Sequence, residues 1–174
     1  MDYKTIDGVP YDIPIVGYAH SPDFSVATLR LWTTRESPNN YQLQSFNQGE
    51  IATAEENSNI THLLYPADHH ITGKRIRLKQ EFLLVGASLQ DIIRDYLERN
   101  ATFNDFSEQV RIQINDTHPA LVIAELMRQL TKRHGLSWEK AWKITQECTS
   151  YTNHTVMKEA LEEWDIELLK NLLP

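Results

Sequence analysis

One short segment constrains the fold most, because its hydrophobic period changes at a single point. Apolar residues alternate from Val110 to Ile114, which predicts a strand with one buried face. Pro119 fits the first turn of a following helix, with Asp116 or Thr117 as the N-cap. A strand that runs directly into a helix is typical of an open α/β sheet. Such sheets bind ligands just past the carboxyl ends of their strands.

The N-terminal half predicts one strand and one long helix. Residues 28–33 alternate polar with apolar, so we expect a strand whose Leu29 and Leu31 side chains face the core. Residues 74–98 carry apolar side chains at three- and four-residue spacing, which predicts an amphipathic helix. Gly86 lies on its apolar face and costs about 1 kcal/mol relative to alanine, so we expect another element to approach it closely.

Three further helices are predicted after the central strand. The first ends at Gly135, Ser137 caps the second, and a link over residues 151–156 leads to a helical tail. The side chains that we expect these helices to bury are Ile123, Leu126, Met127, Leu130, Trp138, Ala141, Trp142, Leu161, Trp164, Leu168, Leu169 and Leu172. The order of elements favours an open α/β sheet with flanking helices.

Composition limits the possible partners and compartments. With 174 residues and 41% hydrophobic content, one globular unit is expected. The net charge of −7 argues against nonspecific binding to nucleic acid or to anionic membranes. Cys148 is the single cysteine, so no intrachain disulfide is possible. No apolar run approaches a membrane span of about 20 residues, and the N-terminus lacks signal-peptide features, so we expect a cytoplasmic protein.

Two polar runs follow segments that are expected to be buried, namely Asn115 to His118 and Thr152 to Thr155. Each contains a histidine, which could donate a proton, bind a sugar hydroxyl, ligate a metal or serve as a structural residue. The histidines show no HExxH or comparable spacing, so no metal site is predicted. The chain also has no nucleophile elbow, GxGxxG or P-loop motif. Two histidines in similar polar runs favour a small-molecule site.

Two other segments leave alternatives open. His69 and His70 lie in a loop bounded by turn residues, which could gate a pocket or simply connect two elements. Basic residues at positions 74, 75, 77 and 79 crowd the start of the long helix, where the helix dipole disfavours positive charge. They form either a solvated basic face or, at Arg77, a group beside an acidic or anionic site.

Several motifs along the chain can be compared with known families. They are Ile114-Asn115-Asp116-Thr117-His118-Pro119-Ala120-Leu121, Tyr151-Thr152-Asn153-His154-Thr155-Val156, Leu64-Tyr65-Pro66-Ala67-Asp68, Arg77-Leu78-Lys79-Gln80-Glu81, Pro10-Tyr11-Asp12-Ile13-Pro14, Arg30-Leu31-Trp32, Gln90-Asp91-Ile92-Ile93-Arg94 and Glu159-Ala160-Leu161-Glu162. In their order and at similar spacing, these motifs resemble those of the α-glucan phosphorylases, the enzymes of glycogen, starch and maltodextrin. The resemblance covers nearly the whole chain.

The resemblance implies a parent enzyme much longer than this chain. Such enzymes cleave α-1,4-glucans with phosphate to give glucose 1-phosphate, and their fold has two Rossmann-like domains facing a cleft, the GT-B arrangement. Pyridoxal phosphate is bound to a lysine of the C-terminal domain. Residues 1–174 resemble the later part of the N-terminal domain only, and the cofactor-lysine motif is missing from them. We therefore expect no cofactor on this chain, no activity alone, and the remainder of a homodimeric phosphorylase as its partner.

The resemblance also implies sugar-contact roles for seven residues, which are His154, Asp116, His118, Asp68, His69, Arg77 and Glu162. In the family, the residue that matches His154 contacts the 6-hydroxyl of the sugar at the cleavage point. The residues that match Asp116 and His118 line the channel beside this sugar. Those that match Asp68 and His69 belong to a mobile loop that gates the cleft.

Some positions depart from the family pattern. Asparagine is common in the family at the position of His69, and some members carry an aromatic residue at that of His70. Asp95 stands where the nucleotide-activated animal enzymes have arginine, and a carboxylate there would repel a nucleotide phosphate. We therefore predict no AMP activation of the parent through this site. The segment of residues 50–59 is shorter than the subunit-contact helix of those enzymes, so communication between subunits should differ.

A free-standing carbohydrate-binding or regulatory module on the same scaffold is the competing interpretation. The ending Leu172-Leu173-Pro174 interrupts a helical pattern, which favours a fragment. A reading frame that continues into a cofactor-lysine domain would support the fragment, and a stop codon would support the module.

Overall fold

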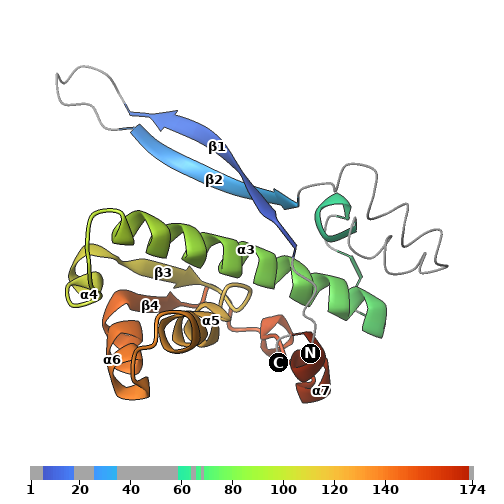
Figure 1. Ribbon diagram of the computed structural model, residues 1–174. Coiled ribbons are helices and arrows are strands. Elements are labelled where there is room, and N and C mark those ends of the chain that lie inside the picture. Colours follow the sequence, from blue (N-terminus) through green and yellow to red (C-terminus); the bar gives the residue numbers. More distant parts are fainter. Residues whose placement is uncertain (1–5, 18–25, 35–58, 64–65, 68, 173–174) are drawn as a thin grey trace, which may run out of the picture. The chain divides into compact units, whose positions relative to one another are not determined.

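The computed structural model describes residues 6–17, 26–34, 59–63, 66–67 and 69–172 of the chain (Figure 1). The chain divides into two compact units, residues 1–80 and 81–174, instead of the single unit expected from its length. Helix α3 (Ile71–Leu97) contributes residues to both units, and its bounds confirm the predicted long helix.

The first unit contains an antiparallel hairpin of β1 (Gly8–Val16) and β2 (Val26–Thr34). Strand β2 confirms the strand predicted at residues 28–33. The predicted burial of its leucines is wrong, because Leu29 and Leu31 are 45% and 47% exposed. Alternation marks two faces of a strand, but burial needs a second layer, which a two-stranded sheet does not supply by itself.

Opposite charges pair across this hairpin at a directly opposed position of the register. Asp12 lies opposite Arg30, and both guanidinium contacts with the carboxylate measure 2.7 Å. The hydrogen bond from Arg30 lowers the pKa of the Asp12 carboxyl group. Because the pair is exposed to water, its main effect is on register.

A single helical turn at residues 59–62 also belongs to the first unit. The Gln80 side chain donates hydrogen bonds to the carbonyl oxygens of Ile60 and Leu63, at 3.0 and 2.6 Å. These bonds hold the turn against the start of α3. The acidic segment of residues 50–59, for which the sequence favours a surface excursion or a short frayed helix, lies outside the described residues except for Asn59.

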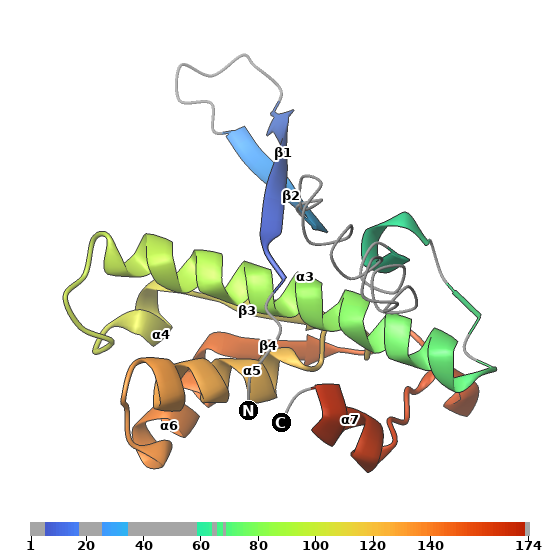
Figure 2. The same ribbon diagram turned by 45° about the vertical axis from the view of Figure 1, so that its right-hand side comes forward.

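The second unit has helices on both faces of a parallel strand pair. Strand β3 (Ile112–Asn115) pairs with β4 (Thr149–Thr152). Helix α3 covers one face, while α5 (Val122–Arg128) and α6 (Trp138–Cys148) cover the other (Figures 1 and 2). This arrangement confirms an α/β fragment. The remaining elements are α4 (Phe106–Gln109), π-helix η1 (Gln129–Arg133), 3₁₀-helix η2 (Lys158–Ala160) and α7 (Ile166–Leu172).

Strand β4 was not predicted, because the sequence was interpreted as a link from Tyr151 onward. Its residues Thr149 to Thr152 are mostly polar and exposed, so they lack the alternation that marks a strand. Pairing with β3 defines this strand, and the register runs from Ile112 opposite Thr149 to Asn115 opposite Thr152. Such long-range pairing leaves no local signal in the sequence.

Helix α5 begins later than predicted. Its first residue is Val122 and its N-cap is Leu121, which makes no side-chain capping bond. Pro119 lies in the preceding turn, where its carbonyl oxygen accepts from the Val122 amide. The predicted capping by Asp116 or Thr117 is therefore wrong. The helix continues into η1, and Gly135 at φ +69° ends it as predicted.

Helix α6 begins as predicted and buries a different face. Ser137 is the N-cap, and its hydroxyl oxygen accepts from the Lys140 amide at 3.3 Å. Ala141 is fully buried, but Trp138 and Trp142 are 65% and 42% exposed, so their predicted burial is wrong. Small and aliphatic residues of α6 pack inward, while both indoles lie towards the surface.

One apolar cluster fills the second unit between α3 and the other helices. Its members are Val85, Leu89, Ile93, Tyr96, Phe103, Phe106, Ile114, Val122, Leu126, Met127, Leu130, Ala141, Ile144 and Cys148. Burial raises the pKa of the Cys148 thiol to about 11, so this thiol is protonated at neutral pH. In the tail, Leu168 is buried and Leu161 is 45% exposed.

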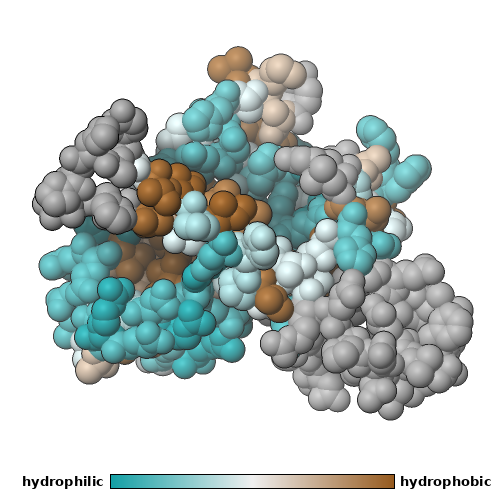
Figure 3. Space-filling view, turned by 90° about the horizontal axis from the view of Figure 1, so that it is seen from above, coloured by the Kyte–Doolittle hydropathy of each residue, from teal (hydrophilic) through white to brown (hydrophobic). Residues whose placement is uncertain are grey.

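Large apolar side chains also reach the surface. Brown hydrophobic patches lie among hydrophilic residues on the face drawn in Figure 3. Tyr11 and Ile15 of the hairpin are 66% and 53% exposed, and Ile166 of α7 is 66% exposed. Exposed apolar surface of this kind favours self-association of the isolated chain. None of the helices in the described part of the chain is long and apolar enough to cross a membrane.

Gly86 is buried on α3, but the predicted close approach by another element is not seen. A Cβ atom added to Gly86 would lie 3.7 Å from the Phe82 ring, an ordinary contact within the same helix. Space for a methyl group therefore exists among the described residues.

We predict that Gly86→Ala raises the free energy of unfolding by up to about 1 kcal/mol, because alanine orders more readily in a helix. Urea denaturation followed by circular dichroism measures this change. Gly135→Ala is the matched control and should lower stability by about 1 kcal/mol, since Gly135 has φ +69°. A less stable Gly86→Ala variant would reveal a close contact at this helix.

Candidate functional site

The two polar runs meet at one edge of the parallel strand pair. Strand β3 ends at Asn115 and strand β4 ends at Thr152. Because the strands are parallel, both carboxyl ends lie at the same edge. The Gln113 side chain donates to the Thr152 hydroxyl at 2.9 Å and to the side-chain Oδ1 atom of Asn115 at 3.1 Å. This edge is where the sequence predicted a small-molecule site.

Asp116 joins the loops that leave the two strands. Its φ of 65° lies in the left-handed region, which aspartate tolerates better than most residues. The Asp116 amide donates to the Thr152 carbonyl oxygen at 2.8 Å. Its carboxylate oxygen Oδ1 accepts from the His154 amide at 3.0 Å. One residue after β3 therefore holds both ends of the stretch from Thr152, the last residue of β4, to His154.

His118 lies between two carboxylates from distant parts of the second unit. Its Nδ1 atom is 3.0 Å from Oε1 of Glu162 and 3.7 Å from Oε1 of Glu81. The Glu81 and Glu162 side chains are only 10% and 14% exposed, whereas His118 is 51% exposed. In this acid–histidine cluster of Glu81, His118 and Glu162, the two carboxylates are largely buried and the histidine is open to solvent.

The acid–histidine cluster also has metal-like spacing. Glu81, His118 and Glu162 each offer one ligand atom, and these atoms lie within 4.8 Å of one another. The Nδ1 atom of His118 already makes a 3.0 Å hydrogen bond to Glu162. We therefore describe the cluster by its hydrogen bond, and its spacing does not by itself identify a metal site.

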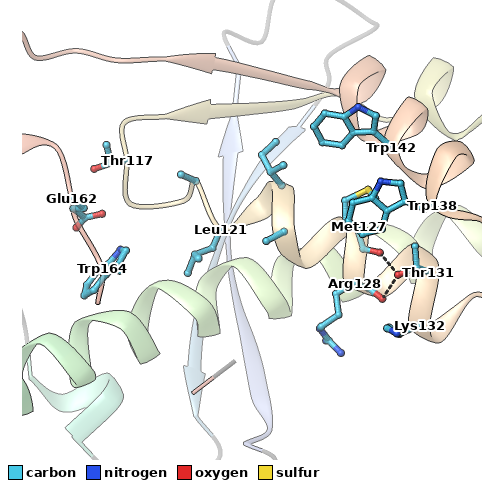
Figure 4. Close-up of a pocket in the computed structure, with 13 residues that line it drawn as sticks. Thr117, Leu121, Met127, Arg128, Thr131, Lys132, Trp138, Trp142, Glu162 and Trp164 are labelled. Atoms are coloured by element: carbon cyan, nitrogen blue, oxygen red, sulfur yellow. Dashed lines mark hydrogen bonds between the residues drawn. The ribbon is translucent and has the colours of Figure 1, made fainter. Parts of the chain in front are cut away.

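An apolar groove of about 620 Å³ runs beside the cluster (Figure 4). Trp138, Trp142 and Met127 lie at one end of it, and Thr117 and Glu162 lie near the other. Its volume is typical of a ligand site. Its mostly apolar lining suits packing against apolar side chains, whereas the hydroxyl groups of a sugar need the polar cluster.

Comparison with known proteins decides the family. The family model described as carbohydrate phosphorylase matches residues 1–174. The chain belongs to the carbohydrate phosphorylase family. It is 45% identical to the liver form of glycogen phosphorylase from Ovis aries over 186 residues, which cover 100% of this chain and 21% of that protein. It is 47% identical to alpha-glucan phosphorylase 1 from Arabidopsis thaliana over 178 residues, or 98% of this chain and 18% of that protein. The chain thus spans about a fifth of the length of these relatives.

Four of the seven site residues predicted for this phosphorylase segment lie in the second unit. Asp116 and the His154 amide are hydrogen-bonded, and His118 contacts Glu162. The structure therefore brings these four residues together as two hydrogen-bonded pairs, Asp116 with His154 and His118 with Glu162, in the segments that follow β3 and β4.

The other three predicted residues belong to the first unit. Arg77 is half-buried on α3, and His69 is exposed just before this helix. Asp68 lies outside the described residues. Their roles in the phosphorylase site stay predictions.

Glu81 joins the site although the sequence did not single it out. It appeared there only as the last residue of a family motif. Its side chain is 10% exposed and approaches His118 from α3. An acidic residue among the apolar positions of an amphipathic helix is the signal that could have found it, because buried carboxylates need polar partners.

We predict an energetic coupling of about 1 kcal/mol between His118 and Glu162 in a double-mutant cycle with alanine. The reason is that Glu162 is largely buried, so removal of His118 takes a partner from a desolvated carboxylate. Urea unfolding of the four variants measures the coupling.

Lys170 and Glu167 provide a matched control at 2.8 Å, with both side chains mostly exposed. Their coupling should stay below about 0.5 kcal/mol. Additive effects at His118 and Glu162 would show that their contact does not persist in solution.

Proposed function

We propose that this chain is part of an α-1,4-glucan phosphorylase and supplies sugar-contact residues to its cleft. Family membership supports this proposal, together with one structural observation. The acid–histidine cluster lies at the carboxyl ends of two parallel strands, the place where α/β sheets bind ligands. Carboxylate and imidazole groups are good partners for sugar hydroxyls because they accept or donate strong hydrogen bonds.

In this proposal the chain binds and orients the sugar. Glu81 and Glu162 provide carboxylate acceptors, and His118 provides a ring nitrogen at the exposed side of the cluster. His154 contacts the 6-hydroxyl of the glucose unit at the cleavage point. Contacts that strengthen as the sugar approaches the transition state raise the rate, whereas contacts of equal strength throughout only tighten binding.

The rest of the proposed phosphorylase supplies the remaining chemistry. We propose that residues 1–174 form the later part of an N-terminal domain in a two-domain, GT-B enzyme that is a cytoplasmic homodimer. Inorganic phosphate, the second substrate, binds outside the acid–histidine cluster, since Glu81 and Glu162 would repel it. For Asp68, His69 and Arg77 we propose sugar-contact roles in the parent enzyme on the family resemblance alone.

Pyridoxal phosphate, the cofactor implied by the family resemblance, supplies a phosphate group for proton transfer when it is bound. The acid–histidine cluster does not fit this group, because two carboxylates flank His118 where a phosphate needs positive charge. We propose that the cofactor binds to another part of the parent, so that this chain contributes only sugar positioning.

A cluster of charges on α3 supports the predicted lack of AMP activation. Arg94 donates hydrogen bonds to Asp91 and Asp95, the latter at 3.1 Å. These contacts raise the pKa of Arg94, mainly through the hydrogen bond to Asp95 and the charge of Asp91. The carboxylates compete with a nucleotide phosphate for this guanidinium group and repel the phosphate.

We predict that the isolated chain releases no glucose 1-phosphate from maltodextrin and phosphate, because it carries only one side of the proposed cleft. A coupled assay of glucose 1-phosphate measures this, with a full-length glucan phosphorylase as the positive control. Turnover by residues 1–174 alone would contradict the proposal. Tight glucan binding without turnover would favour the competing module.

In a full-length phosphorylase that contains this chain, His154→Ala should lower kcat/KM for maltodextrin by about 10-fold through loss of one hydrogen bond to the sugar. Steady-state phosphorolysis measures the change. Lys143→Ala is the control, because Lys143 is 76% exposed on α6 and lies outside the proposed site. Equal kinetics for His154→Ala and wild type would remove His154 from the site.

A further inference from the structure

We infer that Asp116 is a positioning residue that acts through His154, and that its carboxylate serves the loop after β4 instead of the sugar. This inference rests on the proposed function for its effect on the reaction. It assigns Asp116 a role different from the channel-lining contact expected from the family resemblance.

The hydrogen bonds of Asp116 form a clamp around residues 152–154. The Asp116 amide donates to the carbonyl oxygen at the start of this stretch, on Thr152, at 2.8 Å. Its Oδ1 atom accepts from the amide at the end of the stretch, on His154, at 3.0 Å. With both ends held by one residue, the backbone of His154 has a defined position relative to β3.

The left-handed conformation of Asp116 makes this clamp possible. At φ 65° the chain turns sharply after β3, so the amide and the carboxylate of one residue both face the neighbouring loop. The carboxylate is not used to cap α5, because the N-cap of this helix is Leu121 and makes no side-chain bond. Asp116 therefore combines two properties. It tolerates a left-handed backbone, as Gly and Asn also do, and its carboxylate accepts a hydrogen bond from the His154 amide.

Among the described residues, the other hydrogen bonds near His154 stay within the loop after β4. Thr155 and Met157 donate their amides to the side chains of Asn153 and Thr155, so these bonds stay within the loop. In the described part of the chain, the bond from the His154 amide to Asp116 joins this loop to the residue that follows β3. A shift of the His154 backbone would move its imidazole relative to the sugar, and small misplacements reduce rates strongly.

Three substitutions separate the hydrogen bond from the backbone conformation. Asp116→Asn keeps an Oδ1 acceptor and a residue that tolerates positive φ. Asp116→Gly keeps the conformation and removes the acceptor. Asp116→Ala removes the acceptor and strains the backbone as well. Comparison of asparagine with glycine therefore isolates the side-chain bond.

The first measurement follows the His154 amide in the 174-residue chain by hydrogen exchange, which does not depend on activity. We expect exchange in Asp116→Gly to be about 10-fold faster than in wild type or Asp116→Asn, since one hydrogen bond is lost. Equal exchange rates in the glycine and asparagine variants would overturn the clamp.

The second measurement compares kcat/KM for maltodextrin in the full-length phosphorylase. Asp116→Gly should lose about 10-fold and Asp116→Asn should stay close to wild type. The double variant Asp116→Gly/His154→Ala should be no worse than His154→Ala alone, because Asp116 acts through His154.

Additive losses in the double variant, or equal losses with asparagine and glycine, would overturn the inference and show a direct role for the Asp116 carboxylate. Full activity of His154→Ala together with the expected exchange rates would support the clamp and overturn the proposed sugar contact of His154. The two proposals therefore fail in distinguishable ways.

Discussion

Hydrogen bonds between β3 and β4 bring together two loops that are separated along the chain by α5, η1 and α6. Asp116 extends this pairing by one further backbone bond and adds a side-chain bond to His154. Without the parallel pair, no strand pairing would fix the position of His118 relative to the loop that contains His154. The candidate site therefore depends on the pairing of β3 with the mostly polar β4, and the helices packed around this pair stabilise it.

Local signals predicted the elements that depend on local chemistry. Periodicity identified α3, and Ser137 marked the start of α6 through its capping hydroxyl. Strand β4 left no signal, because Thr149 to Thr152 become a strand through pairing with β3. The role of Glu81 was not predicted, because it depends on the approach of Glu81 to His118 in the fold. Trp142 was expected in the core but is exposed, because hydrophobicity alone does not say which face of a helix is covered by another element.

The exposed apolar residues are consistent with a chain that spans about a fifth of its relatives. The hairpin leaves Leu29 and Leu31 about half-exposed, and the groove between α5 and α6 leaves the Trp138 and Trp142 side chains accessible. A self-sufficient domain covers most such surface with its own layers. In the acid–histidine cluster, in contrast, Oε1 of Glu162 contacts His118 within the second unit.

From the crossover between β3 and β4 we also expect a particular order of folding. Parallel pairing requires closure of a long loop, and the entropy of this closure is lost before the strand bonds form. Helices α5 and α6 make local contacts and can form first, so the strand edge with Asp116 and His154 should assemble late. Late-forming regions are commonly among the first to open in the native state. This strand edge should therefore open and close locally while the helical core stays intact.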